Sequence, residues 1–496
     1  MTPGPATIAT MFRPLRLDQP TVGSMRARGV LSTIGIGLQG VLRFVLSVAI
    51  GRIGGPAVLG VVNSAISAAL FLSLLWPASA GAAGSKFVAR ARGAGDFEEA
   101  TVVAAHLGRR TAASTAVLAL VAVAGWATIG HGGVEAGLCV AALVVGYSGY
   151  AFTRGVQFGA GQVARATYWD VTSVLLGLGG VLVALAAGVR GTALVLPLAG
   201  AYLVYTVAGY PHGVHGRPTR VLRRELDGFV LLGVTASMAS GGVLQLSMVV
   251  ARVFDSAAAA GQYASALALA TPASLLASSL NLVLFPAMAE SWGRGDVIGF
   301  RRQTDYAMRL LLLVLVGVFG SLALCSPMLG LIFGPKYAQA EELLPILLLG
   351  VLAVSVAVVP STAITTRSQR GMVIYSATCV GGLLVGILTW LALVPGHGVL
   401  GVAVGNVVAG LVVAVVPTAI VWRDGQRWLA LMVRTVLAVA AVGALLALRQ
   451  AVDLSLWVDV VLVPVFLGTW LAVSAGDVRT VLLPLLRRRR PMMDPG

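Results

Sequence analysis

A single arginine stands well inside the first long apolar stretch of the chain. Arg43 lies within GLQGVLRFVLSVAIGRIGG, residues 37–55, about 15 Å from the nearer end of the helix predicted near 29–53 at the helical rise. An arginine at the centre of a bilayer costs about 2.5–3.5 kcal/mol even on lenient insertion scales, so such a residue usually faces a cavity or a partner. Gln39, Arg43 and Ser47 recur every four residues, which places them on one face of a helix. Because a guanidinium pairs bidentately with phosphate oxygens, this face is suited to binding an anion.

The neighbouring sequence offers Arg43 no evident counter-charge. The chain has 19 acidic residues, and they cluster at helix ends and in loops. Asp170 and Asp459 come nearest to lying within an apolar span. We therefore predict an electropositive cavity that receives a phosphorylated substrate, with a purely structural arginine as the alternative.

The elements that position Arg43 must be membrane-spanning helices. Hydrophobic residues make up 58% of the 496 residues and charged residues 11%, whereas soluble domains average about 45–50% and 25%. Uncharged runs such as 111–130 and 171–189 match the roughly 20 residues that a helix needs to cross the hydrocarbon. The sequence predicts an all-α polytopic membrane protein with about fourteen transmembrane helices.

The basic residues indicate how these helices are oriented. If the N-terminus is inside, most of the 35 lysines and arginines fall in inner segments, where cytoplasmic loops retain them. We therefore expect a multi-pass protein of the plasma (inner) membrane with both termini cytoplasmic. The same distribution explains the net charge of +16 without any nucleic acid. The four arginines at 487–490 are expected to contact anionic lipid headgroups.

Short motifs recur in the two halves of the chain. GAGD at 93–96 and GRGD at 293–296 are offset by 200 residues, as are Arg52 and Arg252. Two copies of six helices that start from the same side are parallel repeats, and substrates of such transporters bind at the repeat interface. We predict an N-lobe and a C-lobe around a central cavity, plus two extra C-terminal helices. The predicted segments are a cytoplasmic basic N-terminal segment (1–28), the N-lobe (29–228), the C-lobe (229–427), two further helices (428–475) and a cytoplasmic basic tail (476–496).

The cavity is expected between the first two helices of each lobe. Its predicted substrate-binding residues are polar positions on those four helices: Arg43, Gln39, Ser47, Asn63, Gln245, Arg252, Asn281 and Arg52. Arg52 and Arg252 would flank the outer mouth, although anchoring at the membrane interface explains them equally well. Small polar residues also join helices to one another, which is the alternative for the serines.

No motif in the sequence indicates catalysis or a bound cofactor. Cys139, Cys325 and Cys379 lie in apolar spans, without the spacing of a metal site or a disulfide framework. HGVH at 212–215 carries possible metal ligands, but a solvated loop explains it better. We predict no enzyme activity, no metal and no cofactor, and leave a coupling ion open.

Three stretches resemble the polysaccharide flippase family. They are LFPAMAESWGRGDVIGFRRQTDYAMRLLLL (284–313), LIFGPKYAQAEELLPILLLG (331–350) and GHGVLGVAVGNVVAGLVVAVV (396–416). That family comprises the Wzx-type exporters of lipid-linked oligosaccharides, within the superfamily of multidrug, oligosaccharidyl-lipid and polysaccharide transporters. The resemblance implies two six-helix lobes that alternate access and carry a polyprenyl-pyrophosphate-linked oligosaccharide from the cytoplasmic to the outer leaflet. It also implies that the family's cationic cavity maps onto Arg43.

Three other functions remain as alternatives. A lipid II-type peptidoglycan precursor flippase fits the same residues. A MATE-like exporter of cationic drugs fits less well, because the helices around the cavity lack a mid-span carboxylate. A membrane glycosyltransferase or polymerase needs carboxylate bases and a sizeable outer loop, and neither is evident. The expected partners are membrane lipids, the polyprenyl-pyrophosphate glycolipid and glycan-assembly enzymes, and the expected state is a monomer.

Overall fold

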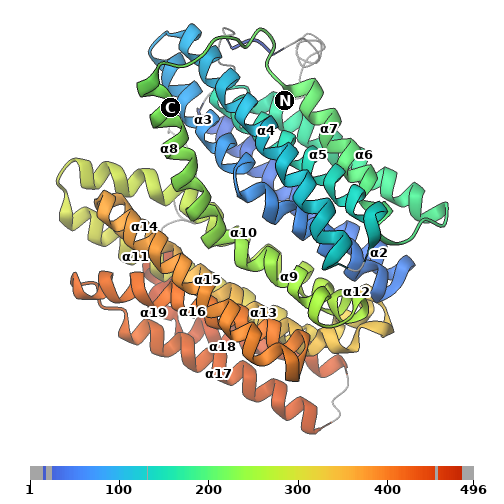
Figure 1. Ribbon diagram of the computed structural model, residues 1–496. Coiled ribbons are helices and arrows are strands. Elements are labelled where there is room, and N and C mark those ends of the chain that lie inside the picture. The colour runs from blue at the N-terminus through green and yellow to red at the C-terminus, as the bar shows by residue number, and fades with distance from the viewer. Residues whose placement is uncertain (1–14, 18–24, 131, 453–455, 483–496) are drawn as a thin grey trace, which may run out of the picture. The chain divides into compact units, whose positions relative to one another are not determined.

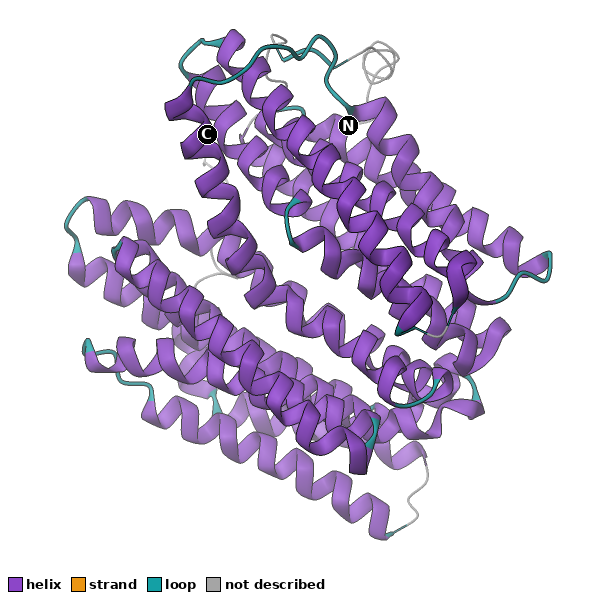
Figure 2. Cartoon of the chain, viewed as in Figure 1, coloured by secondary structure: helices purple, strands orange, loops and turns teal. Residues whose placement is uncertain are grey.

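The computed structural model describes residues 15–17, 25–130, 132–452 and 456–482, and these are almost entirely helical (Figures 1 and 2). Within these ranges ten helices are long and apolar enough to cross a membrane, or eleven if one bent pair counts as a span. The prediction of an all-α polytopic membrane protein is confirmed.

The chain divides into two compact units, Met1–Ala264 and Ser265–Gly496, called here the N-terminal unit and the C-terminal unit. Helix α10, Ala257–Gly293, begins in the first and continues in the second. The predicted border between the lobes, at 228/229, stays a prediction. The N-terminal unit contains α2 (Met25–Leu74), α3 (Pro77–Gly93), α4 (Phe97–Thr128), α5 (Gly133–Gly159), α6 (Val163–Ala186), η1 (Gly191–Val195), α7 (Leu196–Gly209), α8 (Arg220–Ser237), η2 (Met238–Gly242) and α9 (Val243–Phe254). The C-terminal unit contains α11 (Val297–Leu324), η3 (Ser326–Met328), α12 (Leu329–Phe333), η4 (Pro335–Tyr337), α13 (Ala338–Val356), α14 (Val358–Arg367), α15 (Gln369–His397), α16 (Val399–Arg423), α17 (Leu429–Ala451), α18 (Leu456–Val473), α19 (Ala475–Asp477) and η5 (Val478–Leu482).

Three of the fourteen predicted spans account for the lower count of eleven. The first two, predicted near 29–53 and 57–82, run together in α2 as one long helix. The seventh, predicted near 229–253, is interrupted by the π-helical turn η2, which leaves α9 as a shorter apolar helix. The eighth, predicted near 261–287, corresponds to α10, where the side chains of 272–287 lie outside the described residues.

Helix α2 is broken between its first two predicted spans, at Gly55. Gly55 has φ 79° and ψ 179°, a conformation that side chains with a Cβ rarely adopt. Pro56 follows and has no N–H to donate to the preceding turn. The two predicted spans therefore meet at this Gly-Pro break.

Two glycines allow α2 and the start of α10 to cross with their backbones in contact. A Cβ built on Gly60 would lie 1.9 Å from the carbonyl oxygen of Ala257. A Cβ on Gly261 would lie 1.9 Å from the carbonyl oxygen of Pro56. The contact is reciprocal, and it uses the small residues that close helix packing in membranes requires.

Gly60→Ala is expected to lower the free energy of unfolding by about 1–3 kcal/mol, because a backbone carbonyl cannot rotate away from the added methyl group. Thermal or denaturant unfolding of the purified protein in detergent measures this loss. Gly200→Ala in α7 is the matched control, since no atom lies within 4 Å of its Cβ position. Equal stability of the two variants would show that α2 and α10 are not in contact here.

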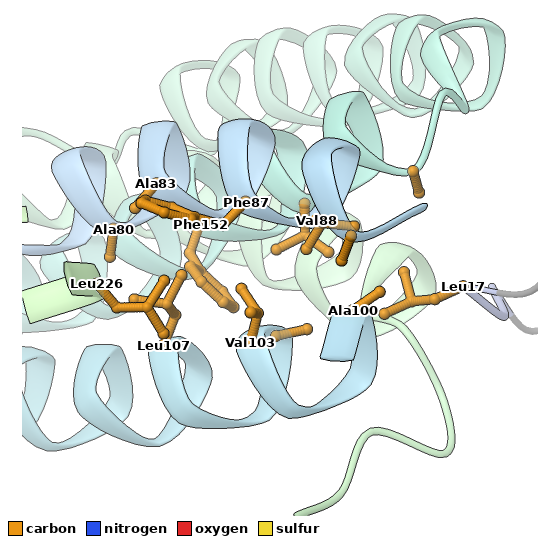
Figure 3. Close-up of a cluster of buried hydrophobic side chains, with 14 of the residues drawn as sticks. Leu17, Ala80, Ala83, Phe87, Val88, Ala100, Val103, Leu107, Phe152 and Leu226 are labelled. Carbon is orange, nitrogen blue, oxygen red and sulfur yellow. The ribbon is translucent and has the colours of Figure 1, made fainter. Parts of the chain in front are cut away.

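A hydrophobic cluster joins α3, α4, α5 and α8 (Figure 3). Phe87 of α3 and Phe229 of α8 pack edge to face, with ring centroids 5.5 Å apart. The Lys86 Nζ lies 4.3 Å from the centroid of the Phe229 ring. Leu226 and Val230 of α8 are fully buried in the same cluster. Helix α8 therefore turns its apolar face to the unit and its arginines outward.

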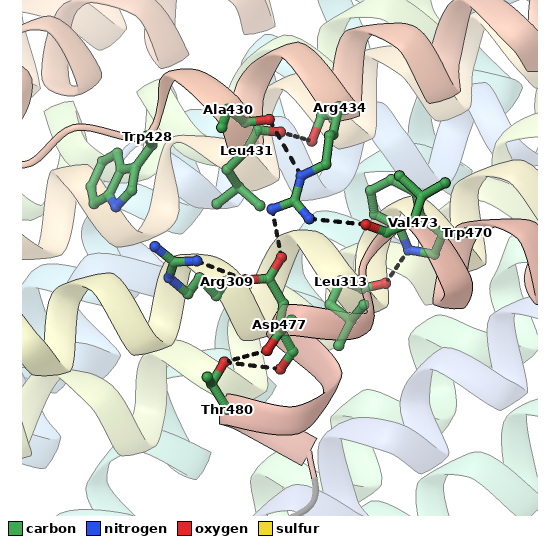
Figure 4. Close-up of polar contacts among 12 residues, drawn as sticks. Arg309, Leu313, Trp428, Ala430, Leu431, Arg434, Trp470, Val473, Asp477 and Thr480 are labelled. Carbon is green, nitrogen blue, oxygen red and sulfur yellow. Dashed lines mark hydrogen bonds and ion pairs between the residues drawn. The ribbon is translucent and has the colours of Figure 1, made fainter.

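Two arginines clamp Asp477 at the end of the last described helices (Figure 4). The carboxylate accepts hydrogen bonds from Arg309 Nη1 of α11 at 2.7 Å and from Arg434 Nη2 of α17 at 2.6 Å. Trp470 Nε1 of α18 donates to the carbonyl oxygen of Leu313 at 2.9 Å. These contacts fix the two C-terminal helices, α17 and α18, against α11.

Asp477→Asn is expected to lower the free energy of unfolding by about 2 kcal/mol, because an amide cannot neutralise both arginines. The cost is smaller than for a fully buried pair, since both guanidinium groups are partly exposed. Glu342→Gln removes an exposed carboxylate of α13 and should change stability by less than about 0.5 kcal/mol. An equally small change for both variants would contradict the clamp.

Candidate functional site: an arginine pocket in the N-terminal unit

Arg43 lies in a pocket between α2, α5 and α7, called here the Arg43 pocket. The arginine is half-buried, and the space around it measures about 350 Å³ with the open mouth included. Tyr147 of α5 and Tyr202 of α7 are the other lining residues with a polar group. The apolar walls are Leu42, Leu46, Ile66, Ala69, Leu70, Leu143 and Leu198.

Within the described ranges Arg43 has neither a hydrogen bond nor an ion pair. One helical turn away, the Nε2 amide of Gln39 is buried and has no hydrogen-bond partner among the residues that the structure describes. A buried donor that is left unpaired costs about 1–3 kcal/mol. Because guanidinium and amide N–H groups both donate, this face of α2 is suited to an anionic acceptor.

The remaining predicted residues are distributed unevenly around this face. Ser47 is buried and continues the predicted stripe on α2. Asn63 donates instead to the carbonyl oxygen of Leu59 at 3.2 Å within its own helix. Arg52 is exposed, Gln245 is half-buried on α9, and the side chain of Asn281 lies outside the described residues.

Arg252 lies in a second pocket of the same unit, formed by α2, α4, α5 and α9 and called here the Arg252 pocket. Ile66 and Ala69 of α2 line the Arg43 pocket, whereas Ala68 and Phe71 line the Arg252 pocket. These pairs point to opposite faces of one helix. Gln39, Arg43 and Ser47 thus share one face of α2 by their spacing, only Arg43 of the three is among the residues that line the Arg43 pocket, and Arg252 lies in a different pocket.

A tyrosine cluster beside the Arg43 pocket was not among the predicted site residues. The ring centroids of Tyr147 and Tyr202 are 5.5 Å apart, and Tyr150 lies 4.9 Å from Tyr202 and 4.7 Å from Tyr205. Tyr147 and Tyr150 of α5 are three residues apart, and so are Tyr202 and Tyr205 of α7. Each helix therefore carries its two tyrosines on one face. That spacing is the sequence signal that would have revealed the cluster.

The tyrosine cluster ends at a buried ion pair between α5 and α6. Asp170 is 0% exposed. It accepts hydrogen bonds from the Tyr150 hydroxyl at 2.9 Å and from Arg154 Nε at 3.0 Å. Asp170 is therefore neutralised within its own unit and is not a free carboxylate. Among the described residues no group of three or more His, Cys, Asp or Glu is placed to hold a metal ion.

The family model that matches this sequence is that of the lipid II flippase MurJ, over residues 183–468, more than half of the chain. The chain belongs to the MurJ family of lipid II flippases. The family consists of membrane transporters, so the prediction that the protein is not an enzyme is confirmed. MurJ proteins lie in the inner membrane, in agreement with the multi-pass architecture.

Solved structures show the same fold at low sequence identity. A structure of lipid II flippase MurJ in an inward closed conformation aligns with a TM-score of 0.67 at 12% identity, covering 91% of this chain and 99% of that one. An inward-facing MATE family multidrug transporter aligns with a TM-score of 0.63 at 15% identity, covering 81% and 95%. A transporter of the same superfamily from Pyrococcus furiosus aligns with a TM-score of 0.57 at 15% identity, covering 84% and 96%. None of the curated proteins matches the chain.

The family that matches differs from the polysaccharide flippase family that the sequence motifs resemble. The superfamily is confirmed, but the matching family is MurJ and not specifically the Wzx-type exporters. The motifs that carried the resemblance lie in apolar spans and at helix ends. Residue types in such positions are set by the membrane more than by the cargo. They therefore indicate the superfamily better than the individual family.

Proposed function

We propose that the chain moves a polyprenyl-pyrophosphate-linked peptidoglycan precursor of the lipid II class from the cytoplasmic to the outer leaflet. Membership of the MurJ family supports this cargo over the plain lipid-linked oligosaccharide that the sequence motifs imply. It makes lipid II itself the primary substrate to test.

The proposal that the pyrophosphate headgroup binds at Arg43 rests on one observation, the half-buried guanidinium in the Arg43 pocket. No acidic side chain of the described residues pairs with Arg43, and the donor of Gln39 is buried beside it. A pyrophosphate supplies several acceptor oxygens that match the fork of a guanidinium. In this proposal Arg43 binds the pyrophosphate, Gln39 donates a further hydrogen bond, and Tyr147 and Tyr202 add their hydroxyl groups.

The proposed architecture is the one that the sequence predicts. It has fourteen spans with both termini cytoplasmic, two six-helix lobes that alternate access, and two further helices. The reciprocal contact of Gly60 and Gly261 supports the repeat, because the two glycines stand at corresponding places near the start of α10 and of the second half of α2. A pseudo-twofold axis along the membrane normal produces contacts of this reciprocal kind.

A MATE-like export of cations is less consistent with the site. The fold relatives include MATE transporters, but fold alone does not define the cargo. A cation needs an available acidic group, and Asp170 is buried in an ion pair with Arg154. The charge in the Arg43 pocket is the positive charge of Arg43, which favours an anionic headgroup.

Reconstitution in proteoliposomes tests this function directly. Three fluorescent substrates are compared: lipid II, a polyprenyl-pyrophosphate-linked oligosaccharide without the peptide, and a cationic dye. We expect lipid II to be flipped fastest and the dye not to be transported. Transport of the dye alone would place the protein among cation exporters, and flipping of the peptide-free oligosaccharide alone would return the assignment to a polysaccharide precursor.

A further inference from the structure

The Arg252 pocket has a different chemistry from the Arg43 pocket. Its space measures about 730 Å³ with the open mouth included. Most of its walls are aliphatic or aromatic, and its one charged lining residue is Arg252. Val121 and Ile129, two residues that line it, are exposed at the surface of the unit. Long apolar walls with a charge at one place suit an amphiphile.

Two buried donors without partners gather at the charged end of this pocket. Arg252 Nε is buried and unpaired among the residues that the structure describes, although its Nη2 donates to the carbonyl oxygen of Gly130 at 3.3 Å. Trp126 is 5% exposed, and its Nε1, which can only donate, is likewise unpaired there. The Arg252 guanidinium carbon lies 5.8 Å from the Trp126 ring centroid. A phosphate group has several acceptor oxygens for such donors, and apolar residues form most of the remaining lining.

We propose that the Arg252 pocket binds an anionic phospholipid of the surrounding membrane, with one acyl chain against the apolar walls and the phosphate at Arg252 and Trp126. The charge of Arg252 selects an anionic headgroup, and the apolar walls lie against the acyl chain. The pocket also lies on the opposite face of α2 from Arg43. The inference does not depend on the proposed flipping activity.

Quenching of Trp126 fluorescence by brominated acyl chains tests this site. The full-length protein is placed in nanodiscs of unlabelled phosphatidylcholine that contain increasing mole fractions of brominated phosphatidylglycerol or brominated diacylglycerol. The chain has nine tryptophans, so the signal of the pocket is the quenching that the Trp126→Phe variant loses. We expect half-maximal quenching of this component at an about tenfold lower fraction of phosphatidylglycerol than of diacylglycerol, as for a hydrogen bond to a charged group.

Arg252→Gln should remove this preference and leave the other tryptophan signals unchanged. Arg190→Gln is the matched control, since among the described residues that exposed arginine donates only to the carbonyl oxygens of Leu185 and Val189 in its own segment. Ala68→Phe, which fills the pocket from α2 and keeps the charge, should abolish the Trp126 component for both lipids. It tests the site even if Arg252→Gln does not fold.

Three results would overturn the proposal. The first is equal quenching by the two lipids in the wild type, and the second is a preference that survives Arg252→Gln. The third concerns the source of the ligand, tested by competition with unlabelled lipids. If polyprenyl phosphate relieves the quenching at a lower mole fraction than phosphatidylglycerol does, the pocket belongs to the cargo lipid. Failure of the flipping assay with a persisting Trp126 preference would reject the proposed function alone.

Discussion

Arg43→Gln is expected to reduce the initial rate of lipid II flipping in proteoliposomes by about tenfold or more. Glutamine keeps much of the length and polarity of the side chain but removes the charge and the bidentate fork. Hydrogen bonds to a charged group contribute about 1.5–3 kcal/mol, which corresponds to a factor of about 10–150. Fluorescence protection from an external quencher measures the flipped fraction with time.

Two further variants separate charge from protein damage in this assay. Arg43→Lys keeps the charge without the planar fork, so we expect a rate between those of the wild type and Arg43→Gln. Arg190→Gln removes an exposed arginine that lies in neither pocket and should flip at the wild-type rate. A wild-type rate for Arg43→Gln would show that Arg43 is structural and that the pyrophosphate binds elsewhere.

Asp170→Asn is expected to lower the free energy of unfolding by about 3 kcal/mol, because it leaves the Arg154 charge buried without its partner. Asp170 is 0% exposed and Arg154 Nε lies 3.0 Å from its carboxylate. Asparagine retains an acceptor for the Tyr150 hydroxyl, so the loss reports mainly on the ion pair. Thermal and denaturant unfolding of the purified protein in detergent provide the measurement.

A double-mutant cycle tests the same pair more strictly. Adding Arg154→Gln to Asp170→Asn removes the orphaned charge and should restore part of the lost stability. Glu98→Gln, an exposed carboxylate in the first turn of α4, is the control and should cost only a few tenths of a kcal/mol. Strict additivity of the two single losses would mean that Asp170 and Arg154 do not interact.

The fold class was accessible from the sequence because the membrane imposes its own composition. Only helices with satisfied backbones cross the hydrocarbon as single segments, so long uncharged runs leave few alternatives. The stripe of Gln39, Arg43 and Ser47 was accessible for the same reason, since helical period alone places the three on one face. In the structure the Nε2 donor of Gln39 is buried without a partner among the described residues, and the role of the three side chains stays a prediction.

The second pocket was not accessible from the sequence. The sequence placed Arg252 in the same cavity as Arg43 because their helices correspond in the two repeats. Which face of α9 meets α4 depends on tertiary packing and on the π-helical turn η2 before it. Helical period defines the faces of one helix but not the neighbours that those faces meet.

The ion pair of Asp170 was hidden by the position of its partner. From the sequence, Arg154 is expected to flank an inner loop with other basic residues. In the structure α5 extends to Gly159, and Arg154 lies largely buried within it. The exact family was hidden too, because headgroup recognition depends on a few side chains in a background of apolar residues. Comparison over residues 183–468 provided what local motifs did not.

The most direct measurement is the dissociation constant of a water-soluble, short-chain lipid II analogue for the wild type and for Arg43→Gln. Titration calorimetry at fixed salt measures binding to the purified proteins in detergent. Because no transport occurs in detergent, the measurement reports headgroup recognition alone. We predict about tenfold weaker binding for Arg43→Gln, and no change for Arg190→Gln. Equal affinities of the wild type and Arg43→Gln would contradict the assignment of the pyrophosphate to the Arg43 pocket.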